Sequence, residues 1–249
     1  MAAESTVTGI VLSVMPIGDY DKRLVILTKE RGKITAFAKG ARKPNSAFLA
    51  CSQPFTFGEF ELYAGRNAYN VMSANISNYF EELRKDPEAA YYGLYFCETA
   101  DYFTHENDDA VQILKLLYQT LRALTQTSIN RMLIRLVFEL KILALNGEAP
   151  QVFECVKCGN AGPAYYFSSE AGGTVCGDCR GRYTDCIKIG DSAIYALQYI
   201  ITSDIQKLYT FTVSNEVMAE LNSCIGNYRR RYIDRDMKSL VLLEKLFKI

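Results

Sequence analysis

The sequence predicts an α+β fold, in which a small β-barrel precedes an α-helical domain that carries an inserted four-cysteine module. Three observations predict it. Apolar residues alternate through the first 80 residues, helical periodicity begins near residue 87, and two C-x-x-C pairs interrupt the helices between residues 151 and 188. With 249 residues, 49% of them hydrophobic, the chain can bury a sizeable core, and we place the domain boundary between residues 80 and 81.

The first 80 residues contain five short segments with strand character. They are 8–15, 23–28, 33–39, 55–63 and 68–76. Turn signals separate them, and in the tight hairpin connection KERGK, Gly32 is expected to adopt a positive φ. Strands this short and this few do not make a sandwich. They predict a closed barrel of the OB type over residues 1–80, a fold that can bind nucleic acid.

From residue 81 onward the sequence predicts helices. Asp86 is a good N-cap and Pro87 suits the first helical turn, so a helix is expected at 87–104. Two more follow at 108–125 and 128–146, and the periodicity returns at 192–203, 215–234 and 237–247. The polar, Gly-rich and Cys-rich segment 151–188 therefore reads as an insertion into a helical domain of residues 81–249.

Four cysteines in this insertion follow the pattern C-x2-C-x17-C-x2-C. They are Cys155, Cys158, Cys176 and Cys179. Two such knuckles, joined by a hairpin, suit one tetrahedral Zn²⁺, and four thiolates leave no open position, so the metal is predicted to be structural. Redox-active pairs or four buried free thiols are the alternatives. Cys186 is the one plausible substitute ligand, and buried thiols are expected at Cys51, Cys97 and Cys224.

The chain has no net charge, yet its charges are unevenly distributed. Residues 22–43 contain eight cations against one anion, whereas residues 81–109 contain nine anions against two cations. From residue 228 to the end there are seven cations against three anions. A binding partner responds to the local electrostatic potential and not to the net charge of the whole chain. The uneven distribution therefore indicates charged partners, even though the net charge is zero.

The cations near residue 40 lie where a predicted strand runs into a turn. Lys33, Phe37 and Lys39 fall on the outer face of that strand, and Arg42 and Lys43 follow Gly40 in the turn. An aromatic ring flanked by cations is typical of single-strand binders on this fold. All five residues are candidates for DNA binding, although Phe37 could instead pack against the helical domain.

A second set of cations lies on the predicted helix 128–146. Arg131 and Arg135 are four residues apart, beside apolar Met132 and Leu136. A cationic stripe next to an apolar groove would suit an acidic peptide, which makes the two arginines candidates for partner binding. Ordinary surface charge explains the same pattern.

The sequence lacks the patterns expected of common enzymes. The single histidine, His105, reads as a surface or cap residue, and no phosphate-binding loop, nucleophile elbow or H-E-x-x-H sequence is present. We therefore predict a protein that is not an enzyme. With no secretory signal and no apolar run long enough for a membrane span, we expect it in the cytoplasm.

The chain resembles the bacterial RecO family of recombination mediators over nearly its whole length. The residues that carry the resemblance are VTGIVLSVMPIGDYDKRLVILTKERGKITAFAKGARKPNS (7–46), FGEFELY (57–63), the four cysteines and YIDRDMKSL (232–240). Its most specific element is KGARKPNS after the strand pattern. Asn45 departs mildly from the family, since a further cation is common there.

The resemblance implies a nucleoid-associated role in DNA repair and recombination. RecO proteins bind single- and double-stranded DNA, anneal complementary strands and engage the acidic tail of single-stranded-DNA-binding protein; with RecR they help load RecA. By resemblance Lys39, Arg42 and Lys43 would contact DNA, and Arg131 and Arg135 would be candidates for the tail. The alternative is a zinc-containing protein-interaction scaffold with no direct role in DNA binding.

Overall fold

The computed structural model describes residues 4–66, 68–162 and 165–247. The chain forms two compact units, which are described separately below. The first contains Met1–Gln126 and Met237–Ile249, and the second contains Thr127–Asp236. The C-terminal segment thus belongs to the same unit as the N-terminal barrel.

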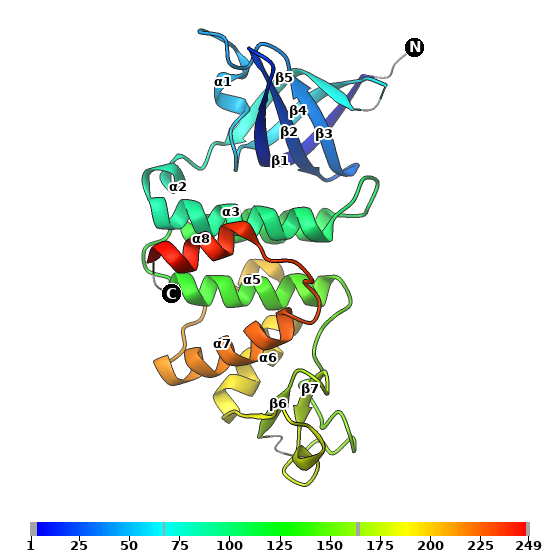
Figure 1. Ribbon diagram of the computed structural model, residues 1–249, viewed down its shortest axis with the longest axis vertical. Helices are drawn as coiled ribbons and strands as arrows, with labels where there is room; N and C mark the ends of the chain where they lie inside the picture. Colours follow the sequence, from blue (N-terminus) through cyan, green and yellow to red (C-terminus); the bar gives the residue numbers. More distant parts are fainter. Residues whose placement is uncertain (1–3, 67, 163–164, 248–249) are drawn as a thin grey trace. The chain divides into compact units, whose positions relative to one another are not determined.

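Five strands form a closed barrel in the first unit (Figure 1). They are β1 Glu4–Ile17, β2 Asp21–Thr28, β3 Gly32–Ala38, β4 Phe57–Ala64 and β5 Tyr69–Asn78. The order around the barrel is β1-β2-β3-β5-β4, and it closes through a short parallel pairing of β3 with β5 and an antiparallel pairing of β4 with β1. The predicted five-stranded OB-type barrel is confirmed, and the helices that follow confirm the fold class.

The first strand is longer than the sequence pattern indicates. Its residues Glu4–Ile10 pair with β4, and its residues Gly9–Ile17 pair with β2. A register shift between Val11 and Ser13 marks the irregularity where it changes partner. One strand that serves two neighbours lets five strands close without a free edge.

Alternation along the strands fills the barrel interior. On β3 the buried residues are Ile34, Ala36 and Ala38, as expected, while Lys33, Thr35 and Phe37 are half-buried on the other face. The interior also takes Ala41, which follows β3 in the turn and is completely buried. Burial of the Ala41 side chain fixes the position of the backbone from which the next two residues, Arg42 and Lys43, extend.

The β2–β3 hairpin turns on Gly32, which has the predicted positive φ, at 62°. The Thr28 hydroxyl donates to the Gly32 carbonyl at 2.8 Å and accepts from the Arg31 amide at 3.1 Å. The hairpin also contacts the segment after the first long helix, because the Lys33 amide donates to the His105 carbonyl at 3.0 Å. An added Cβ at Gly32 would lie only 2.4 Å from that carbonyl oxygen.

Replacing Gly32 by alanine is therefore expected to destabilise the first unit by about 3 kcal/mol, from backbone strain and steric overlap together. Urea unfolding measures the change. Gly18→Ala is the matched control, since Gly18 also has a positive φ, at 53°, but no atom within 4 Å of its would-be Cβ. We expect it to lose about 1 kcal/mol from strain alone. Equal losses would contradict the role of the close contact.

Helices complete the first unit. They are α1 Phe48–Cys51, α2 Glu81–Lys85, α3 Pro87–Phe103, α4 Val111–Leu124 and α8 Lys238–Phe247. The start of α3 is as predicted: the Asp86 carboxylate accepts from the Ala89 amide at 3.1 Å, and Pro87 occupies the first turn. The short helices α1 and α2 were not predicted, because neither spans enough residues to show a periodicity.

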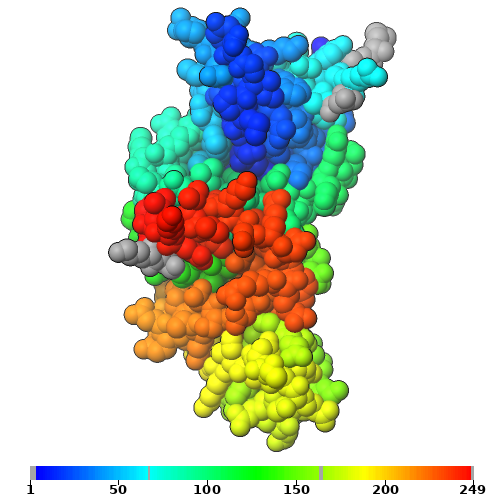
Figure 2. All heavy atoms as spheres, viewed as in Figure 1, coloured from blue at the N-terminus to red at the C-terminus, as the bar shows by residue number. Residues whose placement is uncertain are grey.

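The C-terminal helix α8 packs against α3, where Figures 1 and 2 show it in red at the surface. Its first turn is capped by a residue of α3, since Glu98 accepts from the Lys238 and Ser239 amides at 3.1 and 2.9 Å. A carboxylate at a helix N-terminus satisfies free amides and opposes the positive end of the dipole. Glu98 thereby fixes α8 to the unit that begins the chain.

The second unit combines three helices with the small cysteine module. Its elements are α5 Arg131–Leu145, β6 Tyr166–Ser168, β7 Gly173–Val175, β8 Ile187–Lys188, α6 Asp191–Thr202, α7 Asn215–Arg229 and the 3-10 turns η1 Arg180–Arg182 and η2 Ile205–Lys207. The predicted hairpin between the cysteine pairs is present as β6 and β7, with β8 added beside β6. Pro163 and Ala164, in the same predicted segment, lie outside the described residues.

Two expectations for the helices of the second unit are wrong. The helix predicted at 215–234 ends at Arg229, because the chain turns there through hydrogen bonds from Arg231 and Tyr232 back to Tyr228 and Arg229. The surface stripe expected of Arg131 and Arg135 does not form either. Arg131 is half-buried, but Arg135 is only 5% exposed and its Nε donates to Glu139 at 2.9 Å.

Helix α5 is buried from Leu133 to Leu143, and three of its charged side chains, Arg135, Glu139 and Lys141, contact groups of the second unit. Glu139 is fully buried and also contacts Arg229 of α7, whose Nε lies 3.5 Å away. Lys141 donates to the Ile201 and Ser203 carbonyls at 2.8 and 2.7 Å, at the C-terminal end of α6, and burial lowers the pKa of its amine. Charges that are satisfied in this way join helices rather than bind a partner.

Among the helices of the described residues, none has the length and apolar content needed to cross a membrane.

Candidate nucleic-acid interface and metal centre

Three exposed cations lie on the turn that follows β3. They are Lys39, Arg42 and Lys43, and this cationic loop, residues 39–46, connects the barrel to α1. Buried Ala41 anchors it from inside, and the Lys43 amide donates to the Gly40 carbonyl at 3.0 Å. Asn45 adopts a positive φ of 63°, which asparagine tolerates better than most residues. The conformation of the loop is thus fixed by its own contacts, and its three cations are exposed to solvent.

Lys33 stands apart from this group. Its ammonium donates to the Asp101 backbone carbonyl at 2.6 Å and lies 3.2 Å from the Asp101 carboxylate. Asp101 belongs to α3, so the pair joins the barrel to the helix that covers it. The sequence placed Lys33 with the DNA-binding cations, but its charge is already neutralised, and we leave it out of the contacts proposed below.

Phe37 lies on the outer face of the barrel and is half-buried. It pairs in register with Arg23 on β2 and with Asn70 on β5. Phe37 therefore lies beside a cation on the neighbouring strand, and Lys39 follows it two residues later, just after β3 ends. This position is compatible with either of the roles that the sequence left open.

A cavity of about 570 Å³ opens beside this face of the barrel. Its cations are Arg23 from β2, Lys33 from β3 and Arg66 from the β4–β5 loop, and Tyr69, the first residue of β5, also lines it. The acidic residues Asp101 and Glu106 also line it. Sequence patterns did not indicate Arg23, Arg66 or Tyr69. Alternation along a strand shows which residues share a face, but it does not show which loops lie beside that face.

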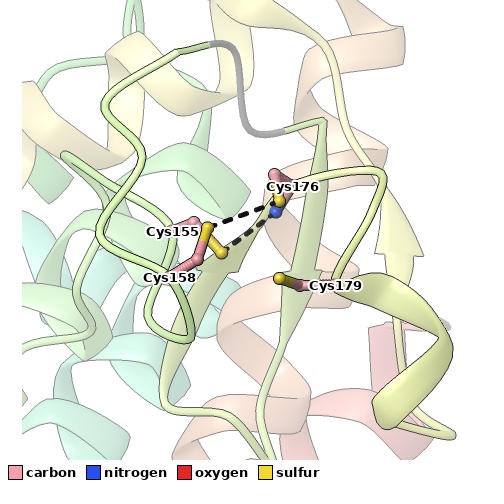
Figure 3. Close-up of side chains that lie close together, drawn as sticks. All are labelled: Cys155, Cys158, Cys176 and Cys179. Atoms are coloured by element: carbon pink, nitrogen blue, oxygen red, sulfur yellow. Dashed lines mark hydrogen bonds between the residues drawn. The ribbon is translucent and has the colours of Figure 1, made fainter.

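The four predicted cysteines come together in the second unit. Their sulfur atoms all lie within 4.8 Å of one another, and they meet from two sides, as Figure 3 shows. Cys155 and Cys158 lie on the turn after α5, whereas Cys176 and Cys179 follow β7. The Cys176 amide donates to the Cys155 sulfur at 3.4 Å, a contact common around metal-bound thiolates. The group could bind a metal ion.

The dimensions of the group fit a tetrahedral ion. Thiolates at 2.3 Å from zinc would place their sulfurs about 3.8 Å apart. The Cys158 and Cys176 sulfurs are 3.8 Å apart. Both C-x-x-C turns bring their backbone amides toward the sulfurs, and Gly159 takes a positive φ of 70° in the first of them. The residues present therefore fit a closed four-thiolate site.

The ionisation of the thiols also suits a cation. Burial alone would raise the pKa of Cys155, but hydrogen bonds from the Cys176, Cys158 and Lys157 amides outweigh it and lower the pKa to about 6. The neighbouring Cys176 thiol and burial together raise the pKa of Cys179 to about 12. Adjacent thiols thus oppose one another's ionisation, and a bound dication would remove that opposition.

The remaining cysteines lie outside this group. Cys186 is half-buried, and its sulfur contacts the Arg180 carbonyl at 3.5 Å. Cys51, Cys97 and Cys224 are buried thiols, as predicted, and burial raises the pKa of each. A raised pKa keeps these thiols neutral and unreactive near neutral pH.

Two family models together account for nearly all of the chain. The model described as recombination protein O N terminal matches residues 1–80, which include the barrel, and the one described as recombination protein O C terminal matches residues 84–240. The second match alone covers more than half of the chain. The chain belongs to the recombination protein O family. The resemblance seen in the sequence is thereby confirmed.

Curated relatives of this RecO chain match it from end to end. "DNA repair protein RecO" of Acetivibrio thermocellus is 32% identical over 243 residues, covering 97% of each chain. The protein of the same name from Alkaliphilus metalliredigens is 33% identical, covering 96% of this chain and 98% of its own. That from Dehalococcoides mccartyi is 30% identical, with coverages of 92% and 90%. Membership of this family supports a general role in DNA repair.

Proposed function

We propose that this RecO protein is a recombination mediator that binds single- and double-stranded DNA and anneals complementary strands without being an enzyme. With RecR it would help load RecA onto DNA coated by single-stranded-DNA-binding protein, in the cytoplasm at the nucleoid. The observation that carries the proposal is the cationic loop. Lys39, Arg42 and Lys43 are exposed on a turn that Ala41 anchors in the barrel.

Annealing of this kind needs neutralised charge and no hydrolysis. Two strands repel each other through their phosphates, and each phosphate that meets a lysine or arginine releases condensed counterions. With the repulsion reduced on both strands, base pairing supplies the free energy that joins them. The three cations of the loop are suited to this purpose, because none of them forms an ion pair with another described residue, whereas Lys33 pairs with Asp101 and Arg135 with Glu139.

The path of a strand follows from the barrel. OB folds bind oligonucleotides over strands 2 and 3, between the loop that joins strands 1 and 2 and the loop that joins strands 4 and 5. Here that face carries Arg23 and Phe37, and the β4–β5 loop supplies Arg66 beside the cavity. We propose that the strand crosses this face from the cationic loop toward the cavity, with Phe37 beside its bases.

The partner and metal assignments are part of the same proposal. Arg135 is buried and pairs with Glu139, so Arg131, half-buried at the start of α5, is left as the candidate for the acidic tail of single-stranded-DNA-binding protein. We assign one structural Zn²⁺ to Cys155, Cys158, Cys176 and Cys179, whose sulfur spacing fits its tetrahedron. RecR is proposed as a partner on the family alone.

The salt dependence of DNA binding tests the loop. If its three cations each contact a phosphate, log K for a single strand should fall with log salt at a slope of about −2. Replacing Lys39, Arg42 and Lys43 together by alanine should flatten the slope and weaken binding about a hundredfold at low salt. Fluorescence anisotropy with a labelled strand measures both quantities.

A control removes the same charge elsewhere. The control replaces Lys115, Lys188 and Lys207 by alanine. These exposed lysines lie outside the barrel, in α4, at the end of β8 and in the turn η2, and their loss should leave the slope unchanged. Equal effects of the two triple variants would mean that only net charge matters. If the parent protein binds no single strand even at low salt, the interaction scaffold becomes the better description.

A further inference from the structure

The turn between β1 and β2 presents an exposed aromatic side chain, Tyr20. The turn is short, since β1 ends at Ile17 and β2 begins at Asp21, and 53% of Tyr20 is exposed. Burial of a large aromatic side chain normally stabilises a protein, so an aromatic residue exposed on a short turn is a candidate for contact with a ligand. The surroundings of this ring supply one.

Tyr20 lies beside the cationic loop, although the two are separated in sequence by the whole β2–β3 hairpin. The Lys43 ammonium is 5.6 Å from the centre of the Tyr20 ring, within the range of a cation–π contact. The Arg42 amide donates to the Tyr20 carbonyl at 2.8 Å. The cations and the ring are therefore neighbours on one surface.

Two more contacts fix the turn to the loop. The Arg42 guanidinium donates to the Gly18 carbonyl at 3.2 Å, and the Gly40 amide donates to the Asp21 carboxylate at 2.7 Å. Contacts on both sides of Tyr20 hold its backbone relative to the loop before any ligand arrives. A prearranged ring loses less conformational entropy when it binds.

We propose that Tyr20 is a stacking platform for a nucleobase of the single strand whose phosphates contact the cationic loop. Tyr20 is 53% exposed and the Lys43 ammonium lies over its ring, so a base that stacks on the accessible part of the ring has a cation beside it. Stacking on an aromatic ring accepts every base, and proteins that bind single strands combine it with a cationic track. The site thus selects unpaired bases without selecting a sequence.

This inference rests on the proposed DNA binding and adds a distinct requirement. Phosphate contacts with Lys39, Arg42 and Lys43 act on single strands and duplexes alike. A stacking platform acts only where a base is unpaired and able to leave its neighbours. Tyr20 would therefore give the loop its preference for single strands, which a set of cations alone does not supply.

The test compares strands with and without bases. A labelled oligodeoxynucleotide, an abasic strand of the same length and a duplex are titrated by fluorescence anisotropy with the parent protein, Tyr20→Ala and Tyr20→Phe. We expect Tyr20→Ala to bind the base-containing strand about tenfold less tightly, the effect of losing one stacked base. Its affinity for the abasic strand and the duplex, and its salt slope, should stay those of the parent. Tyr20→Phe should bind all three as the parent does.

Controls separate this inference from the proposed function. Tyr195→Ala removes another exposed tyrosine, 68% exposed on a helix of the second unit, and should change none of the affinities. If Tyr20→Ala weakens binding to abasic and base-containing strands equally, Tyr20 acts only by supporting the loop and the inference is overturned. Unchanged binding of every strand by Tyr20→Ala overturns it too. Failure of the loop's triple variant to alter binding would instead refute the proposed function.

Discussion

Cys176→Ala is expected to abolish the metal binding proposed for the four cysteines and to unfold the cysteine module. The sulfur of Cys176 is one of four within 4.8 Å of one another, and its loss leaves three ligands for a closed tetrahedral site. Metal binding contributes on the order of 10 kcal/mol to the folding of small zinc modules, which is more than a module with strands of two or three residues can replace. Elemental analysis of the purified protein identifies and counts the metal, and hydrogen exchange over 151–188 reports the unfolding.

Cys186→Ala is the matched control for this prediction. Cys186 lies in the same module, but its sulfur contacts a backbone carbonyl and is not one of the four grouped thiols. We expect this variant to keep the parent's metal content and its protection from exchange. Stoichiometric metal in Cys176→Ala, or its loss from Cys186→Ala, would show that the ligand set is wrong. DNA binding by the barrel should survive in both variants, as expected of a structural metal.

Glu139→Gln is expected to destabilise the second unit by about 3 kcal/mol or more. The carboxylate is buried between Arg135, 2.9 Å away, and Arg229, 3.5 Å away. A neutral amide would remove the carboxylate that both guanidinium groups face in the interior of the protein, and the loss of a buried counter-charge is costly. The midpoint of urea unfolding, with an unchanged m-value, measures the loss.

Glu216→Gln serves as the comparison. Glu216 is an exposed residue in the first turn of α7, the helix that also contains Arg229, and its replacement should leave the midpoint almost unchanged. Replacing Arg135, Glu139 and Arg229 together by apolar residues of similar volume should recover much of the lost stability, since the penalty arises from buried charge. A Glu139→Gln protein as stable as its parent would contradict the role of the buried cluster.

Much of the fold could be predicted because it depends on local patterns. Alternation at Ile34, Ala36 and Ala38 reflects a pleated strand with one face inside a barrel, and Asp86-Pro87 supplies both parts of a helix start. The cysteine group could be predicted for a similar reason. Each C-x-x-C pair forms one tight turn, and only a single hairpin has to fold to join the two turns.

The residues that could not be placed depend on packing between distant segments. Periodicity places Arg135 on a helix, but only the burial of α5 on nearly all sides shows that its charge faces Glu139. The arginine and the glutamate four residues apart, each between apolar residues of the helix, were the available signal. Lys33 meets Asp101 across 68 residues of sequence, and Tyr20 meets Lys43 only because the turn and the loop return to the same end of the barrel.

The pairing of Glu98 with the start of α8 has a consequence for biosynthesis. The helix that completes the first unit is translated only after the whole second unit, which is about 110 residues long. At roughly 5 to 20 residues per second, translation of the second unit takes roughly 5 to 20 s, and during this time α3 lacks its contact with α8. During that interval the apolar surface that receives Leu240 and Leu243 is open to chaperones. The first unit can therefore be completed only after α8 has been translated.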